Sequence, residues 1–222
     1  MWEKSFAAIV LVLACLLMFI YLLEQDENVQ TVASAVYDEK IVAITFDDGP
    51  HGTYTKMLLD GLKERGVRAT FFVVGENIPG NEELILRMHN EGHVIGNHTY
   101  THADLTKISE KAALLEISKT SDLIEQITGE KVQYIRPTCG NWKEELLFEV
   151  DLTPVFWNVD PLDWCTYDVN AVVQRVMAGV SDGSVILFHD IFDTSVAAAL
   201  EVIDRLSAQG YLFVTVDEIL IS

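Results

Sequence analysis

Short apolar runs alternate with amphipathic segments from residue 41 to the end of this 222-residue chain. Most of the runs are continuously apolar and rich in β-branched or aromatic side chains, as strands buried on both faces of a parallel sheet are. They cover residues 41–46, 69–74, 93–96, 133–136, 155–159, 184–188 and 212–216. The spacing of apolar residues predicts helices between them, over residues 54–65, 82–90, 109–128, 143–150, 169–178 and 196–209. Repeated strand-then-helix units predict an α/β fold with parallel strands, and about seven strands favour a distorted (β/α) barrel over a doubly wound sheet.

A long uncharged stretch, residues 6–23, precedes this pattern. About 18 apolar residues are enough for a helix to cross a bilayer core, and a signal peptide has a shorter apolar core. We therefore expect one N-terminal transmembrane helix, with a membrane anchor over residues 1–23, a polar tether over residues 24–38 and a globular domain over residues 39–222. Two alternatives remain, namely a buried core helix and a signal segment cleaved at residues 33–35. Lys4 before the stretch and an acidic cluster after it favour a single-pass protein of the cell membrane, with its domain outside the cytoplasm.

The charge balance argues against one large class of partners. The chain has 15 Lys and Arg against 34 Asp and Glu, a formal net charge of -19 at pH 7. Nucleic acids are bound by clustered basic side chains, so DNA and RNA repel a chain this acidic. We therefore expect no nucleic-acid partner, whereas neutral and cationic substrates stay open. Three cysteines are too few for a disulfide framework, and we expect Cys139 and Cys165 to remain unpaired.

Polar side chains suited to catalysis or metal binding gather at one end of the predicted strands. The carboxyl ends of parallel strands meet at one mouth, where α/β barrels carry their sites. We therefore expect residues distant in sequence to converge there. They are Asp47 and Asp48 after the first strand, His98 and His102 after the third, Arg136 at the end of the fourth, Asp160 and Asp163 after the fifth, and His189 at the end of the sixth.

His98 and His102 have the i, i+4 spacing that places two imidazoles on one side of a helical turn, within reach of one ion. Alone, such a pair is more often a solvated or capping pair. A carboxylate at the end of the first strand can supply a third ligand and leave one position open for water. Adjacent acids point apart, so one of Asp47 and Asp48 can bind the metal while the other acts as a base. The alternative is that both acids only cap the turn at Gly49.

With these motifs in place, the sequence from about Ile41 to Leu220 resembles the polysaccharide deacetylases of carbohydrate esterase family 4, which include chitin, chitooligosaccharide and peptidoglycan deacetylases. The resemblance implies a distorted barrel of about seven strands, in agreement with the strand count above. It rests on motifs that occur in the family's order: TFDDGP at residues 45–50, HTYTH at 98–102, RPTCG at 136–140, WNVDPLDW at 157–164 and ILFHD at 186–190.

The resemblance implies a metal site and a base at the first two motifs. A divalent metal, Zn²⁺ in the first place with Co²⁺ as the second candidate, would be held by Asp48, His98 and His102. Asp47 would remove a proton from the attacking water. Arg136 would orient Asp47 and keep it ionised.

The last two motifs imply an acid and an acetyl pocket. His189 would protonate the leaving amine, and Asp163 would keep His189 protonated, with Asp160 as the second choice for that partner. Leu187 and Trp164 would form a small apolar pocket for the acetyl methyl group. The alternative for both is core packing.

The third motif departs from the family's pattern, which has Pro and an aromatic residue where this chain has Thr138 and Cys139. In the family, the backbone N–H at the position of Cys139 helps to hold the oxyanion, and a main-chain donor survives the change of side chain. An aromatic wall of the groove is lost. We therefore expect the departure to affect substrate preference more than catalysis.

The resemblance predicts a metal-dependent hydrolase that removes N-acetyl groups from GlcNAc residues of a cell-wall or chitin-like polysaccharide, outside the cytoplasm. Two alternatives remain. An O-deacetylase of an acetylated polysaccharide such as xylan would use the same metal site, although a secreted enzyme of that kind is normally released. A catalytically silent carbohydrate-binding domain should have lost the base or a ligand, yet all of these residues are present: Asp47, Asp48, His98, His102 and His189.

Overall fold

The computed structural model describes residue 18 and residues 39–220. Apart from Met18, the predicted anchor and tether lie outside the described residues, and so does the alternative cleavage site at residues 33–35. Among the residues described, no helix combines the length and the apolar composition that crossing a membrane requires. The anchor therefore stays a prediction from the sequence.

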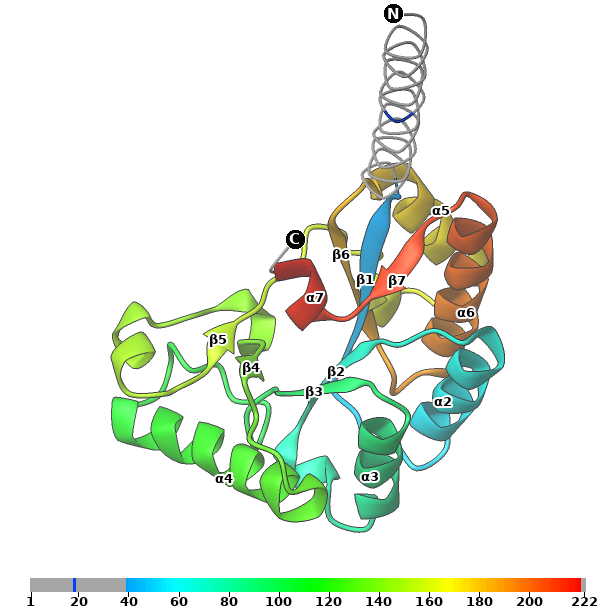
Figure 1. Ribbon diagram of the computed structural model, residues 1–222. Helices are drawn as coiled ribbons and strands as arrows, with labels where there is room; N and C mark the ends of the chain where they lie inside the picture. The colour runs from blue at the N-terminus through cyan, green and yellow to red at the C-terminus, as the bar shows by residue number, and fades with distance from the viewer. Residues whose placement is uncertain (1–17, 19–38, 221–222) are drawn as a thin grey trace, which may run out of the picture. The chain divides into compact units, whose positions relative to one another are not determined.

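The domain consists of alternating strands and helices (Figure 1). The strands are β1 (Ile41–Asp47), β2 (Thr70–Val73), β3 (Val94–Asn97), β4 (Tyr134–Ile135), β5 (Thr153–Pro154), β6 (Ser184–His189) and β7 (Leu212–Val214). The α-helices are α2 (Tyr54–Arg65), α3 (Glu82–Asn90), α4 (Glu110–Thr128), α5 (Val169–Gly179), α6 (Asp193–Ala208) and α7 (Val216–Leu220). The connections contain the 3-10 helices η1 (Gly75–Asn77), η2 (Thr138–Gly140), η3 (Glu144–Phe148) and η4 (Asp163–Cys165).

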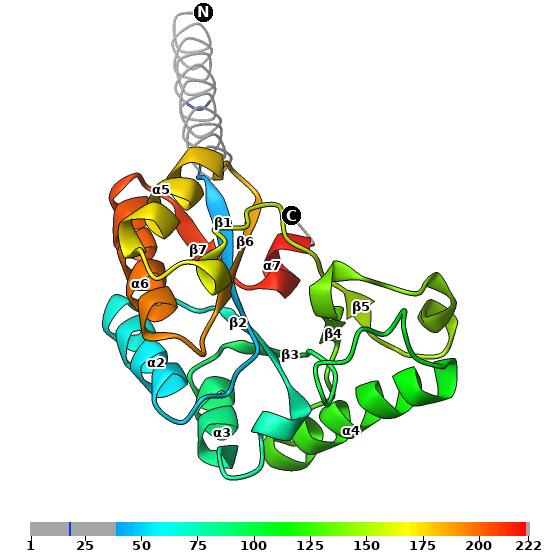
Figure 2. The same ribbon diagram turned by 180° about the vertical axis from the view of Figure 1, so that it is seen from behind.

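One parallel sheet holds these strands in the order β5-β4-β3-β2-β1-β6, and β7 pairs with the first half of β1. β1 has three partner strands, because it pairs with β6 on one side and with both β2 and β7 on the other. The sheet curls into a half-barrel with α2, α3, α5 and α6 around its outside (Figures 1 and 2). The predicted α/β fold with parallel strands is confirmed. The sheet forms a curled half-barrel in place of the predicted distorted barrel.

The predicted fifth strand and fourth helix differ from the structure. The sequence predicts a strand over residues 155–159, but β5 covers only Thr153–Pro154. The segment after it leaves β4 and crosses to β6. Val155 N donates to Ile135 O at 2.8 Å, whereas Val159 N donates to Val185 O at 3.2 Å. The helix expected over residues 143–150 is the 3-10 helix η3, since so short a segment gains few α-helical hydrogen bonds to offset its ordering.

Alternation along β1 decides which residues face the site. Ile44 and Phe46 pack into the main core, whereas Ala43 belongs to a separate inner cluster. Successive side chains of a strand point to opposite faces, so Thr45 and Asp47 lie on the same face as Ala43. The strand is buried on both faces, which explains why its apolar run is continuous up to the acid at its end.

Candidate active site

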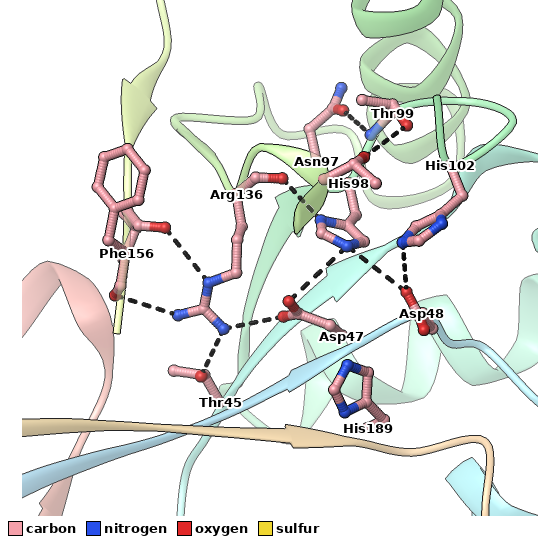
Figure 3. A network of polar contacts seen from close by, with 12 residues as sticks. Thr45, Asp47, Asp48, Asn97, His98, Thr99, His102, Arg136, Phe156 and His189 are labelled. Atoms are coloured by element: carbon pink, nitrogen blue, oxygen red, sulfur yellow. Dashed lines mark hydrogen bonds and ion pairs between the residues drawn. The ribbon is translucent and has the colours of Figure 1, made fainter. Parts of the chain in front are cut away.

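A buried ion pair lies at the carboxyl end of β1. The Arg136 guanidinium donates to Asp47 Oδ1 at 2.8 Å and to the Thr45 hydroxyl at 2.7 Å (Figure 3). Arg136 is fully buried, with the rings of Phe72 and Trp157 centred 4.2 and 5.5 Å from its guanidinium carbon. Burial lowers the pKa of Arg136, and the charge of Asp47 opposes that shift. These contacts fix the orientation of the Asp47 carboxylate.

Asp48 groups with both motif histidines. Its backbone turns into the left-handed region directly after the strand, with φ of 74°. Asp48 Oδ1 lies 3.5 Å from His98 Nε2 and 3.1 Å from His102 Nε2 (Figure 3). The ligand atoms of the three residues all lie within 4.8 Å of one another, as the ligands of one metal ion do. Asp47 Oδ2 also lies near His98 Nε2, at 3.7 Å, but only Asp48 forms an ion pair with His102 and only Asp47 is bonded to Arg136.

The donor set of these three residues fits a divalent cation. Asp48 Oδ1 is buried and has no hydrogen-bond partner of good geometry within residues 39–220, which leaves it available to an ion. His98 Nδ1 donates to the backbone carbonyl of Arg136 at 2.6 Å, so the lone pair of Nε2 faces Asp48. Burial holds the pKa of His98 below its usual value, and a neutral imidazole is the form that binds metal. Burial opposes ionisation of Asp48, but its interactions with His102 and His98 outweigh that effect and lower its pKa.

The histidine pair lies in a loop, so the prediction of a helical turn is wrong. Residues 98–102 follow β3 without forming a helix, and Thr99 and His102 adopt left-handed φ angles of 66° and 57°. Asn97 Oδ1 accepts the Thr99 N–H at 2.8 Å and bends the chain directly after the strand. The loop, not helical periodicity, brings the rings of His98 and His102 to a centroid distance of 5.1 Å.

His189 and Asp163 form a second pair across the mouth. Asp163 Oδ2 accepts the His189 backbone N–H at 2.8 Å, and Asp163 Oδ1 lies 2.9 Å from His189 Nδ1. Burial disfavours the charged imidazolium, but the bond and charge of Asp163 outweigh it and raise the pKa of His189 to about 9. The ring thus keeps its proton through neutral pH and loses it as the pH rises through about 9. Asp160, the second choice for this partner, accepts the Leu162 N–H of its own turn at 2.8 Å.

A cavity of about 430 Å³ lies at the mouth, and both Asp47 and His189 line it. Leu187 is almost fully buried in its wall, whereas Trp164 is 56% exposed, so both line the cavity but only Leu187 is also a core residue. Arg136 and Asp163 are absent from the lining and support residues that form it. The lining residues are Asp47, Asp48, His98, His102, Cys139, Trp157, Asp160, Trp164, Leu187 and His189.

The residue at the altered third motif also lines the cavity. Cys139 has a left-handed φ of 57° within η2. Its backbone N–H has no acceptor within the described part of the chain, so it is available as a donor to a ligand. Cys139 and Cys165 are both free and exposed, as the sequence predicts.

Two further residues of the site were missed by the sequence analysis. Trp157 lines the cavity, although its motif gave no hint of a separate function. Asp190 is fully buried beneath Gly49, where a side chain would collide with its carboxylate. Burial raises the pKa of Asp190 to about 7, and the Thr55 hydroxyl bonds to one of its oxygens. The available signal was the place of Asp190 in the motif ILFHD, directly after His189.

The half-barrel with a candidate metal group at its mouth can now be compared with known proteins. Residues 35–154 match the model of the polysaccharide deacetylase family. The chain is also 38% identical to a peptidoglycan-N-acetylglucosamine deacetylase of Bacillus cereus, over 82% of this chain and 69% of that protein. The chain therefore belongs to the polysaccharide deacetylase family.

Two other relatives are informative. Peptidoglycan-N-acetylmuramic acid deacetylase PdaC of Bacillus subtilis is 42% identical over 82% of this chain, which spans 39% of the length of that relative. Its solved structure gives a TM-score of 0.80, covering 82% of this chain and 90% of that chain. A family 4 acetyl xylan esterase of Clostridium thermocellum, solved with a cobalt ion, is 33% identical with a TM-score of 0.77, covering 82% of this chain and 91% of the other.

Proposed function

We propose that this chain is a metal-dependent hydrolase that removes N-acetyl groups from GlcNAc residues of a cell-wall or chitin-like polysaccharide. The observation that carries the proposal is that one cavity is lined by a candidate metal group, Asp48 with two histidines, by the buried carboxylate of Asp47 and by His189. A base and an acid within reach of one metal group are what amide hydrolysis requires. Relatives named as peptidoglycan deacetylases support the substrate class.

The metal group and Asp47 would prepare the attack. A divalent metal held by Asp48, His98 and His102, Zn²⁺ in the first place and Co²⁺ as the alternative, supplies Lewis-acid activation of water and of the acetyl carbonyl. Asp47 accepts the proton of the attacking water, and Arg136 fixes its carboxylate for that transfer.

The Cys139 N–H and His189 would complete the reaction. The Cys139 N–H donates to the oxyanion that develops on the carbonyl, and His189 delivers a proton to the leaving nitrogen as the C–N bond breaks. Asp163 holds His189 in its protonated form and correct orientation. Leu187 and Trp164 enclose the acetyl methyl group.

The decisive experiment is mass spectrometry of GlcNAc oligomers, peptidoglycan fragments and acetylated xylan after incubation with the soluble domain. We expect loss of acetyl groups from the GlcNAc substrates. In the matched His189→Ala variant, we expect the rate on a GlcNAc oligomer to fall at least about tenfold more than the rate on an activated acetate ester, about 1.4 kcal/mol of barrier. An amine must be protonated to leave, whereas an activated alkoxide leaves unaided.

The same experiment separates the alternatives. Deacetylation of xylan alone would favour an O-deacetylase, which the likeness to an acetyl xylan esterase makes the second candidate. Equal losses on both substrates in the His189 variant would leave His189 with a structural role. No reaction on any substrate, in protein shown to contain metal, would favour a silent carbohydrate-binding domain.

We also propose that residues 1–23 anchor the protein in the cell membrane, with the domain outside the cytoplasm, because residues 6–23 carry no charge and an acidic cluster follows them. The full-length protein should sediment with membranes, and protease added outside intact cells should remove the domain. Recovery of a soluble form that begins near Val36 would identify the segment as a cleaved signal instead.

A further inference from the structure

The two histidines of the candidate metal group are held in different ways. His98 is buried, and its Nδ1 is tied to the backbone carbonyl of Arg136 at 2.6 Å. The His102 side chain is 43% exposed. Among the described residues, its ring forms an ion-pair contact with Asp48 and a ring contact with His98, and no other hydrogen bond or ring contact. The position of His102 therefore depends on the backbone of the loop that carries it.

That backbone is in an unfavourable conformation. Thr99 and His102 both have positive φ angles, which crowd the Cβ of any residue other than glycine. Such conformations persist only where the surroundings fix them. The loop from 98 to 102 thus needs support from outside itself.

Glu116 of α4 supplies that support through three hydrogen bonds. Its Oε2 accepts the backbone N–H groups of Tyr100 at 2.9 Å and Thr101 at 2.7 Å. Its Oε1 accepts the Thr101 hydroxyl at 3.1 Å. One turn further along α4, the Lys119 ammonium lies 4.8 Å from the centre of the Tyr100 ring. Helix α4 therefore holds in place the two residues that directly precede His102.

The other side of the loop is held by η1. Gly75 N donates to Thr99 O at 2.9 Å, and Glu76 N donates to Tyr100 O at 2.8 Å. These bonds fix the carbonyl groups of the loop, whereas Glu116 fixes its N–H groups. Without the carboxylate, the N–H groups of Tyr100 and Thr101 lose their acceptor inside the protein.

We propose that Glu116 is a positioning residue of the metal site, which sets His102 against Asp48 by holding the backbone of the loop from 98 to 102. The inference rests on the proposed metal site but concerns a residue outside every motif of the family. Groups that hydrogen-bond metal ligands directly change metal affinity by about 10-fold to 100-fold when they are replaced, and Glu116, which acts through the residues before His102, is expected at the lower end of that range.

The test compares Glu116→Ala, which removes the acceptor, with Glu125→Ala, at an exposed carboxylate on the same helix whose side chain forms no hydrogen bond or ion pair within the described residues. Dissociation constants for Zn²⁺ and Co²⁺ are measured by competition with a chelator, and thermal unfolding is followed with and without metal. We expect Glu116→Ala to bind both ions at least about 10-fold more weakly and to gain less stability from metal. Glu125→Ala should match the unaltered protein.

The outcomes separate this inference from the proposed function. If the unaltered protein binds no metal, the proposed function fails, whereas unchanged affinity in Glu116→Ala overturns only the role of Glu116. If Glu116→Ala does not fold, Glu116→Asp keeps the charge but withdraws the carboxylate by one methylene, and it should weaken metal binding in the same direction, with Glu125→Asp as its control. Unchanged affinity in Glu116→Asp would then overturn the inference.

Discussion

Replacing Asp47 by Asn should lower the deacetylation rate by about 10²-fold to 10⁴-fold while the protein keeps its metal. The amide is nearly isosteric and can still accept a hydrogen bond from Arg136, but it cannot take a proton from water. Asp47 stands beside the candidate metal group of Asp48, His98 and His102, and its carboxylate is bonded to the Arg136 guanidinium instead.

Steady-state rates and elemental analysis of the same preparations test this assignment. Asp122→Asn is the matched control, because Asp122 is exposed on α4 and does not line the cavity. That control should retain most of the activity. Loss of metal from the Asp47 variant, together with retention of metal by an Asp48→Asn variant, would reverse the roles of the two acids.

Removal of metal should abolish activity altogether, and addition of Zn²⁺ or Co²⁺ should restore it. The reason is the convergence of Asp48 Oδ1 with the Nε2 atoms of His98 and His102, which supplies three ligands and leaves a fourth position for water. Asp48→Asn should correspondingly weaken metal binding, because a neutral amide replaces the anionic ligand.

The measurement is activity before and after treatment with a chelator, followed by titration with each ion. Metal content must be determined in parallel. Full activity in a preparation shown by elemental analysis to lack metal would refute the dependence. Restoration of activity by an ion that fails to bind in the competition assay would place the active metal at some other site.

The sequence predicts well those parts of the site that follow from strand geometry. Asp47 and His189 end two strands that pair in parallel, with Asp47 opposite His189 in the register. A parallel register aligns strand ends, so residues that end adjacent strands must be neighbours. The continuous apolar runs therefore locate both residues before any coordinates are known.

The loops are less predictable, because their paths depend on contacts with distant elements. The spacing of His98 and His102 suggested a helical turn, yet left-handed backbone angles and the bonds from Glu116 determine the loop. The loss of an aromatic residue at Cys139 was visible in the sequence, but not that Trp157 lines the same cavity. No periodicity in the sequence marks Glu116 as different from the other acids of its helix.

The three partner strands of β1 have a consequence for the order in which the chain can fold. Its neighbour β6 is far away along the chain, since the Thr45 hydroxyl bonds to a carbonyl 141 residues later, and β7 follows later still. Contacts between such distant segments form slowly, because a long loop must close before they stabilise anything. During synthesis β1 can pair with β2 early, but its edge toward β6 stays open until nearly the whole chain has been made. An open strand edge can pair with another chain, so the incomplete domain is more prone to aggregation than the finished one.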